Sequence, residues 1–269
     1  MAGATARLNL DVQAYLSRIG YHGPRDPSGA TLRSLHRQHL FTVPFENLDI
    51  ALGVPIQLDP GALFDKIAVR KRGGFCYELN GLFYELLVRL GFRVEMLSAR
   101  VRREDGGFSP EFDHLLLKVS LPDEWIADVG FGESFIHPLP MPPAGKRSDD
   151  DPDFAVLPAD SAWDLVRRRG DGVFVPLYRF TKAPRKLADF ASRSRFHQTS
   201  PDSHFTRRRF CSKALPDGRV TVSGMRLIIT RSGVRRESQL RDREELCNCL
   251  REHFGIELPD HTDWSKLAG

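Results

Sequence analysis

Apolar residues recur three or four positions apart through much of residues 1–91, which is the spacing of helices with one buried face. The first such stretch has Asp11 where an N-cap is expected and Gly20 where the helix should end. The stretches 31–40 and 58–69 repeat the pattern. We therefore expect the N-terminal part of the chain to be helical.

One segment in this part combines two glycines, an aromatic residue and a cysteine: RGGFCYELNG, residues 72–81. From Leu79 to Leu90 apolar residues again recur at helical spacing, and Gly91 closes the pattern. The pattern predicts a helix that has Cys76 in its first turn.

Short runs rich in β-branched and aromatic residues replace the helical pattern in the middle of the chain. Four such runs, at 92–101, 113–119, 124–131 and 172–180, are expected to be strands. Residues 140–154 are rich in proline and charge and are expected to form a loop.

The last part of the chain mixes both patterns. Residues 182–196 have a helical pattern, residues 220–234 suggest a hairpin, and residues 241–256 suggest a further helix. The order is therefore helices, then strands, then a smaller α/β unit, and the expected fold class is α+β.

The composition excludes little by itself. The chain has 269 residues, with 39 Lys and Arg against 35 Asp and Glu, a net charge of +4 and a pI of about 9.0. This balance suits an anionic small ligand as well as nucleic acid. A nucleic-acid-binding module is suggested only by the pI and by the basic run 206–210, and it predicts salt-sensitive DNA binding that does not depend on Cys76. Because nothing else in the sequence supports it, we do not expect a nucleic-acid partner. We expect no membrane partner either, because no stretch approaches the ~18 apolar residues of a membrane span.

The spacing of the cysteines argues against a disulfide framework and against a zinc site. The four are Cys76, Cys211, Cys247 and Cys249. The N-terminal residues also lack the apolar core of a signal peptide. We therefore expect a reduced, cytoplasmic location and no metal.

Cys76 is the first candidate for chemistry. A thiol acts as a nucleophile in its thiolate form, and the N–H groups and dipole at a helix start stabilise an anion, so we expect a lowered pKa. Gly73 and Gly74 would let the chain turn sharply and leave room for a substrate. The alternative is a buried cysteine that only begins a core helix.

A histidine and an aspartate are expected to meet on a hairpin. If Val119 faces Asp123 across the turn, His114 lies directly opposite Asp128. An acid in that place would hold the imidazole in one tautomer and support its charged form, as the base of a nucleophile requires. A slip of one residue would separate the two, and the alternative is a surface ion pair. Together with a cysteine, the pair would form an acyl-transfer site.

The other cysteines and histidines gain no such support. Cys249 fits the buried face of a helix, and His36 and His39 belong to a helical pattern. His197 and His204 flank a polar segment and are expected in a loop.

Several segments together resemble the arylamine N-acetyltransferases. VPFENLDI, RGGFCYELNGLF, DHLLLKV, ADVGFG and HQTSPDSHF occur in the order of that family, and with PDGRVTVSG they span about residues 41–224. The Arg-Gly-Gly-aromatic-Cys run followed by Asn-Gly is highly specific. Tyr77 and Leu79 depart from the family, since many members carry Phe and Gln there.

The resemblance implies three parts. These are an N-terminal helical bundle at 1–91, which carries the cysteine, a central β-barrel at 92–195, which carries the histidine and the aspartate, and a C-terminal α/β lid at 196–269. The core would hold a cysteine-protease-like Cys-His-Asp arrangement.

The resemblance also implies roles for single residues. Cys76 would be the nucleophile, His114 the base, and Asp128 the acid that orients the base. Phe131 would line the acceptor pocket, and Phe205 would lie near the channel by which the substrates enter.

The implied activity is acetylation of an arylamine or arylhydrazine by acetyl-CoA, in a ping-pong mechanism through an acetyl-cysteine. Acetyl-CoA would be a co-substrate, with no bound cofactor, and Arg207 to Arg209 are candidates for contact with its phosphates. Two alternatives use the same triad: an amide synthase that releases and cyclises an aromatic polyketide chain, and a hydrolase in which water replaces the amine. No oligomeric state is implied.

Overall fold

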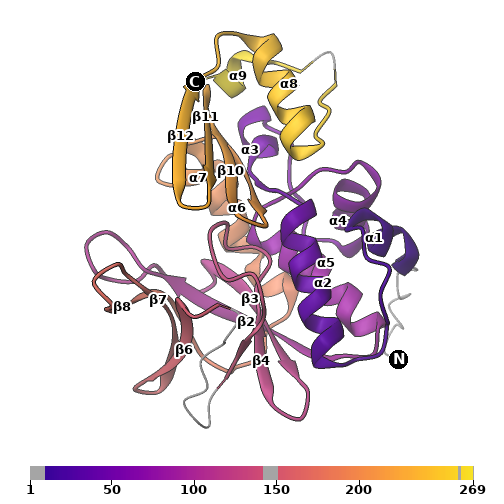
Figure 1. Ribbon diagram of the computed structural model, residues 1–269, viewed down its shortest axis with the longest axis vertical. Helices are drawn as coiled ribbons and strands as arrows, with labels where there is room; N and C mark the ends of the chain where they lie inside the picture. Colours follow the sequence, from indigo (N-terminus) through magenta and orange to yellow (C-terminus); the bar gives the residue numbers. More distant parts are fainter. Residues whose placement is uncertain (1–9, 142–150, 260–261, 269) are drawn as a thin grey trace.

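A bundle of helices forms the N-terminal part of the computed structural model, which describes residues 10–141, 151–259 and 262–268 (Figure 1). The predicted helices are confirmed, α3 is an additional one, and most of the loop expected at 140–154 lies outside the described residues. The elements are α1 (Val12–Arg18), α2 (Gly29–Thr42), α3 (Leu48–Leu52), α4 (Pro60–Phe64), the π-helical turn η1 (Asp65–Val69) and α5 (Cys76–Arg89).

The ends of these helices lie at the residues that the sequence indicated. The Asp11 carboxylate accepts a hydrogen bond from the N–H of Ala14 at 3.0 Å, and Asp59 accepts one from Gly61 at 2.9 Å. Both bonds satisfy N–H groups that have no partner inside the helix. Gly20 follows α1 with a φ of 67°, a conformation that other residues rarely adopt.

A curled antiparallel sheet forms the middle of the chain. Its strands are β2 (Arg93–Val101), β3 (His114–Ser120), β4 (Glu124–Ala127), β5 (Leu139–Pro140), β6 (Phe154–Ala159), β7 (Ala162–Arg168) and β8 (Phe174–Phe180). They are arranged in the order β5-β4-β3-β2-β8-β7-β6, and the two edge strands contact each other. The sheet is therefore a nearly closed barrel, as predicted, although the sequence did not indicate β6 and β7.

A second antiparallel sheet joins distant parts of the chain. Its strands, in spatial order, are β1 (Phe45–Glu46), β9 (Phe210–Leu215), β10 (Gly218–Ser223), β11 (Arg226–Arg231) and β12 (Val234–Gln239). Strand β1 comes from the N-terminal helical part, and Phe45 pairs with Ser212 of β9. The predicted hairpin is confirmed as β10 and β11. The remaining helices are the 3-10 turn η2 (Leu187–Phe190), α6 (Ala191–Thr199), α7 (His204–Arg207), α8 (Arg243–Phe254) and α9 (Ser265–Ala268).

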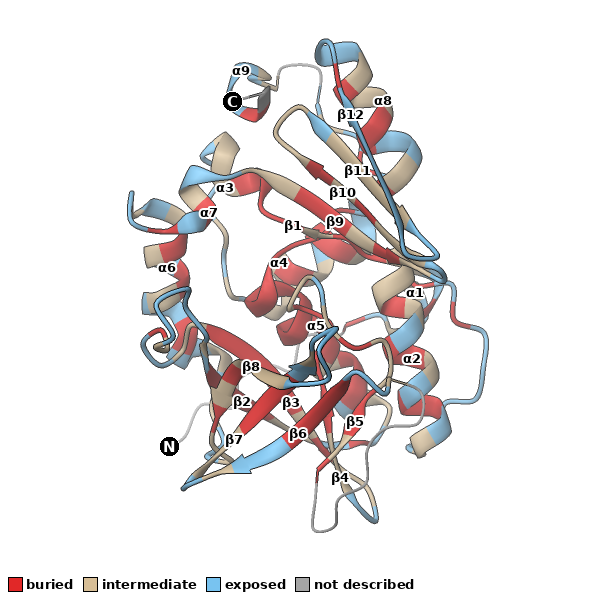
Figure 2. Ribbon diagram, turned by 60° about the vertical axis from the view of Figure 1, so that its left-hand side comes forward, coloured by how far each residue is buried: buried red, intermediate tan, exposed pale blue. Residues whose placement is uncertain are grey.

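Most residues of helix α5 are buried. Figure 2 shows buried residues on this helix and on the strands that it faces. Leu115, Leu117 and Val119 of β3 pack in the same core cluster as Leu82 and Leu86 of α5. Each fully buried side chain of this size contributes about 1.5–3 kcal/mol. The apolar packing therefore fixes α5 against the barrel.

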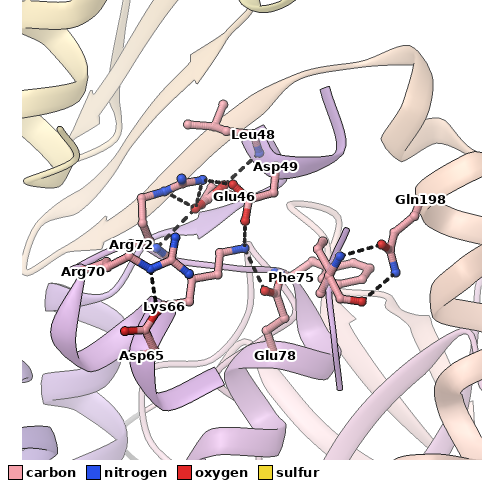
Figure 3. A network of polar contacts seen from close by, with 12 residues as sticks. Glu46, Leu48, Asp49, Asp65, Lys66, Arg70, Arg72, Phe75, Glu78 and Gln198 are labelled. Atoms are coloured by element: carbon pink, nitrogen blue, oxygen red, sulfur yellow. Dashed lines mark hydrogen bonds and ion pairs between the residues drawn. The ribbon is translucent and has the colours of Figure 1, made fainter. Parts of the chain in front are cut away.

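Three carboxylates and two cations are buried beside the start of α5 (Figure 3). We call Glu46, Asp49, Lys66, Arg72 and Glu78 the buried charge cluster. Lys66 Nζ lies 2.8 Å from Asp49 Oδ2 and 2.7 Å from Glu78 Oε1. Arg72 Nη2 lies 2.8 Å from Glu46 Oε1 and 2.8 Å from Asp49 Oδ1. Each buried charge therefore has a partner of opposite sign, which burial requires.

The buried charge cluster holds the backbone that precedes α5. Glu78 Oε2 accepts a hydrogen bond at 3.1 Å from the N–H of Phe75, the N-cap residue. Glu46 Oε1 accepts another from the N–H of Gly73 at 3.3 Å. The carboxylates thus bond to the polypeptide backbone as well as to the cations, and they set the direction in which the chain enters α5.

Gly73 and Gly74 are explained by close packing. A Cβ on Gly73 would lie 2.0 Å from the carbonyl oxygen of Pro44, and a Cβ on Gly74 would lie 2.7 Å from Glu78 Oε2. Neither glycine has a left-handed φ. Close packing rather than a left-handed turn therefore requires these glycines: Gly73 lies against the backbone of Pro44, and Gly74 lies against the side chain of Glu78.

Lys66→Met should destabilise the fold by about 3–5 kcal/mol, because it leaves carboxylates buried without their cation. The free energy of unfolding in urea measures the effect. Arg70→Met is the matched control, since Arg70 pairs with Asp65 at 2.7 Å on the surface, where a salt bridge contributes about 0–1 kcal/mol. Equal losses in the two variants would contradict the assigned importance of the cluster.

Candidate active site

Cys76 is the first residue of α5, and only 3% of its surface is exposed. The loop that follows β4 lies directly against it. A Cβ on Gly130 would be 2.8 Å from the Cα of Cys76, so only glycine permits this approach. The close contact brings the end of β4 to the start of α5.

His114 and Asp128 form the predicted hydrogen bond, with 2.7 Å between Nε2 and Oδ2. The register that led to this prediction is wrong by two residues, because Val119 faces Trp125 and not Asp123. Strand β3 runs one residue further than expected before the turn. Since side chains alternate along a strand, a shift of two keeps both residues on one face, as diagonal neighbours.

Three further donors hold the Asp128 carboxylate. Asn80 Nδ2 and the N–H of Gly130 donate to Oδ1 at 2.8 and 3.0 Å, and the Tyr178 hydroxyl donates to Oδ2 at 2.9 Å. Burial alone would raise the pKa of Asp128, but His114, Asn80 and Gly130 hold it below its ordinary value. The carboxylate is therefore ionised and fixed in orientation.

Asn80 and Tyr178 are site residues that the sequence analysis missed. Asn80 is four residues after Cys76, so the two share one face of α5, and this spacing was a usable signal. Its Oδ1 also accepts the N–H of Val129 at 2.9 Å. Tyr178 comes from β8, and no local pattern pointed to it.

His36 is a third missed residue, which was placed only in a helical pattern. Its Nε2 accepts the backbone N–H of Asp128 at 3.0 Å, so Nδ1 carries the proton and donates to the carbonyl of Ile136 at 2.7 Å. The ring stacks on Phe135, with 5.5 Å between centroids. Burial lowers the pKa of His36 to about 4, which fits the neutral ring that these bonds require.

Cys76 and His114 share the wall of one cavity of about 210 Å³. Phe131 and Phe205, the aromatic residues expected near the substrates, lie in the same wall. The Phe131 ring is 5.0 Å from the His114 ring. The full lining is Phe45, Cys76, Val101, Asp113, His114, Gly130, Phe131, His204 and Phe205. A wall of this kind suits a flat aromatic ligand.

The environment of the Cys76 thiol corrects one expectation. Burial raises its pKa well above the ordinary value, and the carboxylates of Asp128 and Asp113 raise it further. Backbone N–H groups act in the opposite direction but do not outweigh burial. The helix start alone therefore does not give the Cys76 thiol a low pKa.

A wider groove of about 630 Å³ adjoins the cavity and shares Val101, Asp113 and His204 with it. Arg207 and Arg208, two members of the basic run, lie in its wall. Further basic side chains in the wall are Arg102, Arg103 and Arg193. The wall also holds Glu104, Asp105, Asp113 and Asp202. Arg103 and Arg193 are paired with two of these, so the groove offers charges of both signs with a small excess of arginine.

The remaining candidates have structural surroundings. All four cysteines are free thiols. Cys249 lies on the buried face of α8, as expected, in the same core cluster as Leu246 and Leu250. His197 and His204 lie in α6 and α7, so the expectation of a loop was wrong. In the described part of the chain, no group of His, Cys, Asp and Glu could hold a metal, and no helix is long and apolar enough to cross a membrane.

A thiol at a helix start, with an imidazole and a carboxylate bonded to each other beside it, is typical of enzymes that transfer acyl groups through a cysteine. Comparison with known proteins gives the family. Residues 30–263 match the N-acetyltransferase family model. The arylamine N-acetyltransferase of Mycolicibacterium smegmatis is 35% identical over 260 residues, which cover 93% of this chain and 94% of that protein.

Solved structures agree with this. The arylamine N-acetyltransferase of Nocardia farcinica superposes with a TM-score of 0.84 at 37% identity, covering 97% of this chain and 94% of that one. The Mycobacterium marinum enzyme in complex with CoA gives 0.85 at 31%, covering 96% and 97%. The chain therefore belongs to the arylamine N-acetyltransferase family, whose members are acyltransferases.

The buried, neutral state of His36 predicts a loss of stability in acid. Its pKa is lowered on folding, so the unfolded chain binds the proton more tightly, and stability is lost as the pH falls from its ordinary pKa of 6.5 toward 4. Between about pH 7 and pH 4 this group should remove about 3 kcal/mol. His36→Gln should lack that part of the pH dependence, and unfolding in urea at several pH values measures the difference. Parallel pH profiles for the two proteins would contradict the assignment.

Proposed function

We propose that the protein transfers the acetyl group of acetyl-CoA to an arylamine or arylhydrazine through an acetyl-Cys76 intermediate. The observation that carries the proposal is the single cavity that Cys76 and His114 share, with Asp128 bonded to the imidazole at 2.7 Å. Family membership supports the reaction, and the aromatic wall supports the acceptor class.

In the first half-reaction, His114 takes the proton of Cys76 and the thiolate attacks the carbonyl carbon of the thioester. Because Nε2 is bonded to Asp128, Nδ1 is the nitrogen available to the thiol. The bond between the carbonyl carbon and the CoA sulfur breaks. The imidazolium then returns its proton to the CoA thiolate, and acetyl-Cys76 remains.

Asp128 makes the proton transfer from the thiol possible. The thiol is buried and its pKa is raised, so the transfer requires a stabilised imidazolium. An ionised carboxylate at 2.7 Å supplies that stabilisation, and its own bonds to Asn80 and Tyr178 hold it in place. The backbone N–H groups in the first turn of α5 are suited to bind the oxyanion of the tetrahedral intermediate.

In the second half-reaction, the amine nitrogen attacks the acetyl carbon and His114 accepts a proton from it. The carbon–sulfur bond to Cys76 breaks, and the thiolate–imidazolium pair is restored. An arylamine is neutral at pH 7, unlike an aliphatic amine, so it enters a largely apolar cavity without losing a charge. Phe131 and Phe205 would hold its ring.

The adjoining groove would receive the rest of the donor. Its wall contains Arg207 and Arg208, which suit the phosphates of CoA, while Arg209 remains the third candidate of that run. Neither half-reaction needs a metal or a bound cofactor. The four free thiols support a reducing, cytoplasmic location.

Acetyl-CoA alone should add one acetyl group to the protein at Cys76 and release one equivalent of CoA. Addition of 4-methylaniline should remove the group and give the acetylated amine, with ping-pong kinetics. Intact mass, peptide mapping and assay of free CoA measure these steps. Cys76→Ser should show no acetylation at that position.

Two results would overturn the proposal. An acetyl group on Cys211, Cys247 or Cys249 would show that the nucleophile is misassigned. Steady release of CoA without any amine, at the rate seen with one, would indicate a hydrolase.

Asp128→Asn should keep the fold and lose about 10⁴-fold in turnover, because an amide cannot support the imidazolium and favours the wrong tautomer. The acetylation rate of Cys76 and the acceptor turnover measure the loss, and circular dichroism checks the fold. A variant with half of the normal turnover would show that the carboxylate is only structural.

A further inference from the structure

Asp113 stands beside the proposed active site without a part in the mechanism above. It precedes His114 directly and lies in the wall of both the 210 Å³ cavity and the adjoining groove. It is close enough to Cys76 to raise the pKa of the thiol. Its charge therefore opposes formation of the nucleophile, and its presence calls for another explanation.

The contacts of Asp113 fix its carboxylate in place. His197 Nε2 lies 2.9 Å and Arg193 Nε 2.5 Å from Oδ1. His197 is 2% exposed, and its Nδ1 bonds to the Ser203 hydroxyl at 3.0 Å. Burial would raise the pKa of Asp113, but His197, Ser109 and Arg193 lower it to about 2. The carboxylate is ionised at any pH at which the protein would work.

The charged side chains around Asp113 are distributed unevenly between the cavity and the groove. Arg193 lines the groove but not the cavity, whereas Asp113 lines both. His204 also lies in the cavity wall, and although this residue is exposed, desolvation of its ring and the neighbouring His197 lower its pKa, so it adds no positive charge there at neutral pH. The proposed His114 imidazolium is balanced by Asp128. Asp113 is thus the one carboxylate among the described residues that line the cavity, and it gives that wall a negative charge.

We propose that Asp113 is a specificity-determining residue that favours acceptor arylamines with a cationic or hydrogen-bond-donating ring substituent and disfavours those with an anionic one. This inference rests on the proposed function, since it concerns the acceptor of the same reaction. In a largely apolar cavity, opposite charges attract more strongly than in water. A carboxylate on the ring would bring two like charges together, which acts against the wrong ligand.

The cation must be separate from the nitrogen that reacts. A protonated amine has no lone pair with which to attack acetyl-Cys76, so an aliphatic amine gains nothing from Asp113. The favoured class is therefore a neutral aromatic amine that carries its positive charge elsewhere on the ring.

Three acceptors test the charge preference at neutral pH. They are 4-(aminomethyl)aniline, which is a cation, 4-methylaniline, which is neutral, and 4-aminophenylacetate, which is an anion. In the two charged compounds a CH₂ group separates the charge from the ring, so the three aromatic amines have similar reactivity. We expect kcat/KM in the native protein to be about tenfold higher for the cation and about tenfold lower for the anion than for the neutral compound. Product analysis must show acetylation of the aromatic nitrogen.

Asp113→Asn keeps the size of the side chain and removes the charge. It should bring the three kcat/KM values to within about threefold of one another. Glu111→Gln is the matched control, since Glu111 is two residues away and half-exposed, with Arg185 at 3.4 Å, and it should keep the native order.

The outcomes separate the inference from the proposed function. If the native protein acetylates 4-methylaniline but handles the anion as well as the cation, the inference is overturned and the function stands; this holds even if the variant fails to fold. An equal loss for all three acceptors in Asp113→Asn would show a structural role only and would also overturn it. If none of the three is acetylated by the native protein, the proposed function itself fails.

Discussion

The buried charge cluster is the constraint on which the site depends. Charges are costly to bury, and these are tolerated because every carboxylate reaches a cation and two carboxylates also bond to backbone N–H groups. The segments that contribute to it are β1, α3, η1, the connection between η1 and α5 that carries Arg72, and the start of α5. Each of these segments must be in place before the charges that the other segments carry have their partners. The position of the sulfur of Cys76 is thus set by electrostatics outside the cavity in which it would react.

The barrel supplies the other half of the site by a different means. His114 begins β3, and Asp128 follows β4, so a strand ladder brings them together. The bonds of Asp128 then reach α5 through Asn80 and α2 through His36. The start of α5 and the end of the β3–β4 hairpin meet at Gly130, and they can do so because glycine has no Cβ. Apolar packing, ion pairs and hydrogen bonds thus together determine the position of Cys76.

Local chemistry determined how much of this could be predicted from the sequence. Caps such as Asp11 and Asp59 act on the next three residues, so the helix starts were predictable. The face shared by His114 and Asp128 was predictable because alternation survives a shift of two residues, although the register itself was wrong.

The missed features depend on contacts between distant segments. Tyr178 reaches Asp128 from β8, and the raised pKa of Cys76 follows from burial by the whole fold. The pairing of β1 with β9 is equally invisible in either segment alone. Gly73 and Gly74 were noticed in the sequence, but the residues against which they pack, Pro44 and Glu78, could not be inferred.

The pairing of β1 with β9 has a consequence for how the chain folds. Strand β1 is only two residues long, and its partner lies far along the chain, so this contact closes a very long loop. Such contacts form late and slow the folding of a protein. While the chain is being synthesised, helices α1 to α7 and the barrel strands leave the ribosome before β9 does. Until then the edge of β1, next to Glu46 and the entry to α5, has no strand beside it, so the region around Cys76 reaches its final order only near the end of synthesis.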